Sequence, residues 1–87
     1  MDLKSVHRKI SGLILMHLGI DNDMAFVRNN IRRGGRNEVL FWAKPNAKSI
    51  TGYSISFLIN DKDTAQKMQT IEQFLKKEIT FDQLFNN

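Results

Sequence analysis

This chain of 87 residues contains no cysteine, and that absence removes several kinds of chemistry at once. Without thiols there is no disulfide framework, no thiolate zinc site and no cysteine nucleophile. Long apolar runs are also missing: runs such as residues 13–16 are far below the roughly 20 residues that a membrane span requires. Nothing at the start of the sequence has the pattern of a cleavable leader. We therefore expect a cytoplasmic protein that does not have a membrane partner.

Length and composition predict one small folded domain over residues 1–87. A chain this short has no room for a second core, and it buries only about 60–65% of its unfolded surface. Charged residues make up 25% of the chain and hydrophobic residues 41%, which is ordinary for a globular protein and excludes wholesale disorder. We expect a folded domain of modest stability.

Negative charge is scarce in the first half of the chain. Residues 1–48 carry nine lysines and arginines against four acidic residues, whereas residues 49–87 carry four against five. The net charge of +4 therefore belongs to the first half. An excess of positive charge favours an anionic partner, although it says nothing about the fold.

Two N-terminal helices are predicted. Between residues 3 and 18 apolar residues recur every three or four positions, and Gly19 follows as a helix stop. Residues 21–23 offer N-caps for a second helix over residues 23–33, with Met24, Val27 and Ile31 on its inner face. Arg28 and Arg32 would then lie on its outer face.

A β-hairpin and a last helix follow. Residues 38–44 and 50–60 have the composition of paired strands, with Pro45 in the turn between them. Helices, or a third strand from elsewhere, must cover the face that carries Tyr53 and Phe57, because a lone hairpin is marginal. Residues 60–77 show helical periodicity, and Thr80 has the spacing of a capping box. The fold class is therefore α+β, with the order ααββα.

This order, with a short glycine-containing turn between the first two helices, resembles a winged helix-turn-helix. The residues that carry the resemblance are 18–20 at the turn, Arg28, Asn29 and Arg32 on the second helix, and 44–48 at the tip of the hairpin. The resemblance implies that the second helix reads DNA and that the hairpin is the wing.

The sequence offers little to catalysis. His7 and His17 lie on different faces of the first helix and cannot chelate one ion, so we expect no metal. The pairs Asp21/Asp23 and Asp61/Asp63 lack the further ligands and the glycine of a calcium loop, and helix capping explains both. No phosphate-binding glycine loop is present either. We expect no cofactor and no enzymatic activity.

Residues 32–36, Arg-Arg-Gly-Gly-Arg, are the strongest local concentration of chemistry. Arginine stays charged and presents a planar fork of donors that suits phosphate. An alternative explanation is that cations at a helix C-terminus complement its dipole. The candidate residues for binding nucleic acid or an anionic partner are Arg28, Arg32, Arg33, Arg36, Lys44 and Lys48.

The first strand of the hairpin suggests a second surface. If Val39, Phe41 and Ala43 face the core, then Leu40 and Trp42 form an apolar pair on the other face. Such a pair is a candidate contact surface for a base or a partner protein. The alternative is that a terminal helix covers Trp42.

Two functions fit these features. The first is a small basic module that binds nucleic acid in a regulatory role. The alternative is a protein-interaction module, such as a compact inhibitor, an adaptor or an immunity-like factor, that docks onto an acidic or nucleic-acid-binding partner protein. A homodimer formed by the end of the first helix and the edge of the hairpin is a third arrangement.

Overall fold

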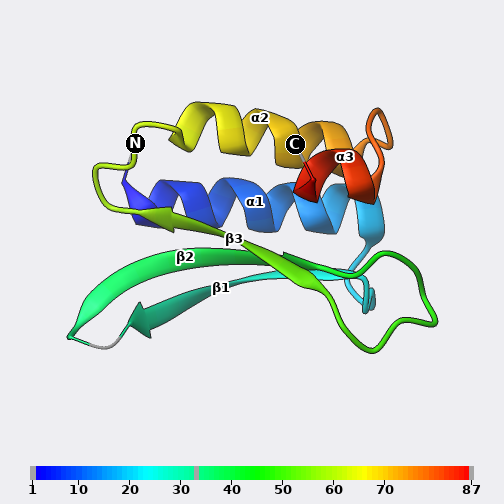
Figure 1. Ribbon diagram of the computed structural model, residues 1–87, viewed down its shortest axis with the longest axis horizontal. Helices are drawn as coiled ribbons and strands as arrows, with labels where there is room; N and C mark the ends of the chain where they lie inside the picture. The colour runs from blue at the N-terminus through cyan, green and yellow to red at the C-terminus, as the bar shows by residue number, and fades with distance from the viewer. Residues whose placement is uncertain (1, 33, 87) are drawn as a thin grey trace.

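Three strands and three helices make up the domain. The computed structural model describes residues 2–32 and 34–86, and of Arg32 it describes only the backbone. The elements in chain order are α1 (Leu3–Leu18), β1 (Ala25–Arg32), β2 (Arg36–Ala43), β3 (Tyr53–Leu58), α2 (Thr64–Leu75) and α3 (Phe81–Phe85). The strands form one antiparallel sheet in the order β1-β2-β3. Helices α1 and α2 lie side by side over one face of this sheet (Figure 1).

The α+β class is confirmed, but the predicted order ααββα is wrong. One helix precedes the strands, and residues 25–32, predicted as a second helix, form strand β1. This strand is the third one that the hairpin needs. The resemblance to a winged helix-turn-helix fails with the second helix, because the structure has no reading helix at these residues.

The segment that forms β1 satisfies two periodicities. Met24, Val27 and Ile31 have helical spacing, yet Ala25 and Val27 also alternate with Phe26 and Arg28 as in a strand. Asparagines 29 and 30 are weak helix formers, and the segment carries aromatic and β-branched residues that favour strands. Pairing with β2 along all eight residues decides the outcome.

The residues predicted to cap the second helix start β1 instead. The side-chain oxygen of Asn22 accepts hydrogen bonds from the backbone N–H groups of Met24 and Ala25, both at 3.0 Å. The preceding stop is as predicted: α1 ends at Leu18, and Gly19 follows with a positive φ of 86°. The connection therefore turns the chain directly from α1 into the sheet.

Glycines 34 and 35 form a hairpin turn and do not end a helix. Their φ angles are 91° and 82°, in the region that glycine adopts without a steric penalty. Arg32 and Arg36, on either side of the turn, are register partners. Arg33, a predicted binding residue, lies outside the described residues.

The hydrophobic core lies between the sheet and the helices. Val39, Phe41 and Ala43 are fully buried, which confirms that this side of β2 faces inward. Phe57 of β3 is in register with Val39 and is equally buried. The helices contribute Val6, Ile10 and Ile14 from α1, Met68, Ile71 and Leu75 from α2, and Leu84 from α3.

Both C-terminal helices form as predicted, but α2 is shorter than the predicted range of residues 60–77. Helix α2 begins at Thr64, because Asn60 has a positive φ of 64° and turns the chain after β3. The capping box at Thr80 is confirmed: its hydroxyl accepts the N–H of Gln83, and the Gln83 side chain accepts the N–H of Thr80. Among the described residues, no helix combines the length and apolar character that crossing a membrane requires.

Candidate functional site

The face of the sheet turned away from the helices is the open face. Because side chains alternate along a strand, the register places on it one residue in two from each strand. Among the described side chains, these residues are Phe26, Arg28 and Asn30 of β1, Arg36, Glu38, Leu40 and Trp42 of β2, and Ser54, Ser56 and Leu58 of β3. No described helix packs on this face in Figure 1.

One end of the open face is aromatic. The rings of Phe26 and Trp42 are stacked, with centroids 5.0 Å apart and planes 21° from parallel. The indole also lies against Gly52, since a Cβ at that glycine would stand 2.6 Å from two of the ring atoms. Phe26 keeps 40% of its surface exposed, and the guanidinium carbon of Arg28 lies 5.8 Å from its ring centroid. Guanidinium, phenyl and indole groups thus lie next to one another.

Glu38, the acidic member of the open face, lies in its middle. Asn30 donates a hydrogen bond of 2.8 Å from its side-chain amide to Oε1 of this carboxylate. Only 4% of Glu38 is exposed, so its neighbours cover the negative charge almost completely. A buried carboxylate needs such polar partners, because burial otherwise disfavours the charged form.

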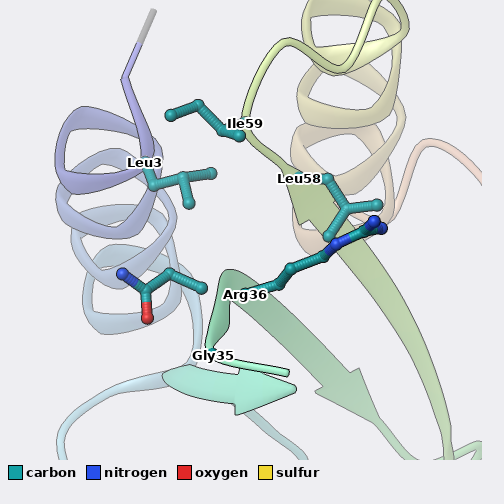
Figure 2. A pocket seen from close by; sticks show the side chains of 6 residues that line it. Leu3, Gly35, Arg36, Leu58 and Ile59 are labelled. Atoms are coloured by element: carbon teal, nitrogen blue, oxygen red, sulfur yellow. The ribbon is translucent and has the colours of Figure 1, made fainter. Parts of the chain in front are cut away.

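The other end of the open face is cationic. Arg36 is exposed and directly opposite Arg32 in the register. Figure 2 shows the Arg36 side chain extending from β2 toward Leu58, at the mouth of a cleft of about 640 Å³. Leu3 and Ile59 line the apolar side of this cleft. Arg36 therefore presents its charge beside an apolar hollow at the end of the sheet.

Four of the eight predicted site residues come together on the open face. Arg28 and Leu40 are register partners in its centre, and Trp42 and Arg36 lie at its two ends. By the register Trp42 lies on the open face, where its ring stacks on that of Phe26. Arg28 joins the three β2 residues on this face because residues 25–32 form a strand.

The two predicted lysines lie apart from this group. Lys48 is exposed in the connection between β2 and β3. Lys44 is buried, with Nζ 3.4 Å from Asp23 Oδ2 and 3.3 Å from the carbonyl oxygen of Ala47. Its ammonium group therefore contacts the connection that precedes β1 and the loop that follows β2.

Phe26 is the residue that the sequence interpretation missed. A helix over residues 23–33 places it beside the inner face, whereas β1 places it on the open face against Trp42. The signal was available: Phe26, Arg28 and Asn30 alternate with Ala25, Val27 and Asn29 at the period of a strand. Asparagines in place of strong helix formers support the same interpretation.

The chemistry of this surface is that of contact and charge. Among residues 2–32 and 34–86, no group of three or more histidines and carboxylates is arranged to hold a metal ion. No protein-family model, curated protein or solved structure matches the chain. The geometry of the open face is therefore the basis on which a function is inferred.

Proposed function

We propose that this chain is a non-enzymatic module that binds nucleic acid through the open face of its sheet. The observation that supports the proposal is the register, which gathers Arg28 and Arg36 on one face with the stacked pair Phe26 and Trp42. Guanidinium groups suit phosphate oxygens, and aromatic rings suit bases.

The charge of the open face supports an anionic partner. Its acidic residue, Glu38, is 4% exposed and hydrogen-bonded to Asn30, whereas Arg28 and Arg36 are exposed. The charge that a partner meets on the described part of this face is therefore positive. A net charge of +4 for the chain adds a long-range attraction to polyanions.

The test is a salt titration of oligonucleotide binding, followed by fluorescence anisotropy. The double variant Arg28→Ala/Arg36→Ala should weaken binding and lower the slope of log K against log salt by about 1.4–1.8, because each phosphate contact contributes about 0.7–0.9. The matched control, Arg8→Ala/Lys9→Ala, removes the same charge from the exposed side of α1. This control should lower the slope of log K against log salt by less than Arg28→Ala/Arg36→Ala does. Absence of wild-type binding to any oligonucleotide at low salt contradicts the proposal.

A protein-interaction module is the second candidate, and one observation favours it. A hollow of about 410 Å³ lies between the end of α1 and β1, and Leu15 and Ile20 beside it are 56% and 84% exposed. Exposed apolar groups that share one hollow are typical of contact surfaces. A stoichiometric protein complex that survives nuclease treatment and high salt would favour this candidate, and loss of the complex under either condition would favour nucleic acid.

A further inference from the structure

The aromatic end of the open face is built to receive a flat group. Phe26 lies on β1, an edge strand, and Trp42 supports one side of its ring at 5.0 Å. Gly52 in turn lies against the indole, where a side chain would collide with it. The backbone at Gly52 therefore packs on Trp42, and Trp42 packs on Phe26. Phe26 remains 40% exposed, and the guanidinium group of Arg28 lies 5.8 Å from the centroid of its ring.

We propose that the open face binds single-stranded nucleic acid in preference to duplex, with an unpaired base stacked on Phe26. The inference rests on the proposed function and names its substrate class. Arg28 lies over the same ring, and its planar guanidinium can cover the second side of the base or bind the adjoining phosphate. The ring, the base and the guanidinium would then form one stack.

The aromatic pair distinguishes single strands from duplex. In a duplex the faces of the bases are stacked on one another, so a protein reaches only the base edges and the phosphates. Phe26 has no hydrogen-bonding group in its side chain, and Trp42 has only its indole N–H. The pair is therefore poorly suited to reading base edges, which arginine and asparagine read with paired hydrogen bonds. A free strand offers the base faces themselves, and stacking on aromatic side chains is the usual way in which proteins hold it.

The dimensions of the open face fit a short strand. From Trp42 to Arg36 the six residue steps along β2 span roughly 20 Å. A strand that stacks a base at the aromatic end can therefore place a later phosphate beside Arg36. The covered carboxylate of Glu38 lies between Leu40 and Arg36 along β2, so we expect few contacts with the strand at that point. A site of about four nucleotides follows, at the lower end of known single-strand sites.

The experiment compares single-stranded DNA, single-stranded RNA and a hairpin duplex of the same length, each titrated into the full chain. Trp42 is the single tryptophan, so its fluorescence reports on the aromatic end directly. We expect quenching by a single strand, and a single-strand affinity at least tenfold above that for the duplex. Such a preference for single-stranded DNA, for single-stranded RNA or for both supports the inference. A difference in affinity between the two shows whether the site prefers deoxyribose or ribose.

Substitutions at Phe26 test the stack itself. Phe26→Leu keeps an apolar side chain but removes the ring, and should lower single-strand affinity about tenfold while leaving duplex binding unchanged. Phe26→Tyr keeps the ring and should bind as the wild type does. Tyr53→Leu is the matched control, because Tyr53 is an exposed aromatic residue that packs against α3 on the other face. Circular dichroism of each variant checks the fold.

The outcomes separate this inference from the proposed function. Equal binding of duplex and single strand without quenching of Trp42 overturns the inference and leaves nucleic-acid binding standing. Equal losses in Phe26→Leu and Tyr53→Leu also overturn it, because the effect would then not be specific to the open face. Absence of binding to all three oligonucleotides overturns both proposals.

Discussion

The two faces of the sheet come from the same strands but have opposite character. On the face under the helices, Val39, Phe41 and Phe57 are fully buried. On the open face, Phe26 is 40% exposed and lies beside Trp42 and Arg28. Alternation along each strand thus gives one set of residues to the hydrophobic core and leaves the other set free to contact a partner. Changes on the two faces should therefore affect different properties of the protein.

The largest expected difference is between two phenylalanines on neighbouring strands. Phe41→Ala removes a fully buried ring and should lower the free energy of unfolding by about 3–5 kcal/mol. Phe26→Ala removes a partly exposed ring stacked on Trp42 and should cost only about 1 kcal/mol. Urea denaturation followed by circular dichroism measures both. Similar losses in the two variants would show that the open face also maintains the fold.

The next largest effect on stability is expected at Gly52, which lies against the indole of Trp42. A Cβ at this position would collide with the backbone oxygen of Ala43 and with the indole, so Gly52→Ala should destabilise the protein by about 1–3 kcal/mol. It should also shift the emission of Trp42. The control is Gly12→Ala in α1, where a Cβ meets nothing within 4 Å. That substitution should stabilise the chain by about 0.5–1 kcal/mol, and a loss comparable to that of Gly52→Ala would contradict the argument.

How far the sequence predicts this molecule differs between segments. Residues 3–18 and 53–58 each follow a single periodicity, and both were predicted as the elements they form. Residues 25–32 fit two periodicities, and the choice depends on pairing with β2, a contact that local propensity does not contain. Pairing with β2 therefore makes residues 25–32 a strand and not a helix.

The candidate site shows the same division. The arginines and Trp42 could be named from their chemistry alone, but the place of Arg28 on the same face as Arg36 and Trp42 depends on β1 being a strand. A helix turns successive side chains by 100° and a strand by 180°, so the wrong element also misplaces Phe26. Lys44 was predicted at the tip of the hairpin, but it is buried, and its ammonium group contacts Asp23 from the connection before β1. In both cases the outcome involves a contact with a residue that is distant in the sequence.

A pH-dependent effect is expected on the helix-covered side, at Asp61. Its carboxylate accepts hydrogen bonds from Lys67 Nζ at 2.6 Å and from the N–H of Asp63 at 2.9 Å. The Lys67 hydrogen bond is the main cause that lowers the pKa of Asp61 below its usual value of 3.8. Lys67 also donates to the carbonyl of Ser56, so this group connects α2 to β3.

The sign follows from that lowered pKa. Ionised Asp61 stabilises the fold fully above the unfolded pKa, and this stability is lost as the pH falls through the lower folded pKa. Asp61→Asn should therefore cost about 1 kcal/mol at pH 7, and the difference from the wild type should shrink below about pH 4. Urea denaturation across pH measures this. The exposed Asp21→Asn is the control, and a difference that grows in acid would contradict the assignment.

The smallest effect on stability is expected at Arg28, in the centre of the open face. Its described contact within the chain is with the ring of Phe26, at 5.8 Å, and such an exposed interaction contributes at most about 1 kcal/mol. Arg28→Ala should thus leave the urea midpoint almost unchanged while it weakens oligonucleotide binding. If the variant instead unfolds at clearly lower urea, Arg28 belongs to the structural part of the sheet and the division between the two faces fails. If stability and binding are both unchanged, the open face is divided from the core but does not use this arginine to bind nucleic acid.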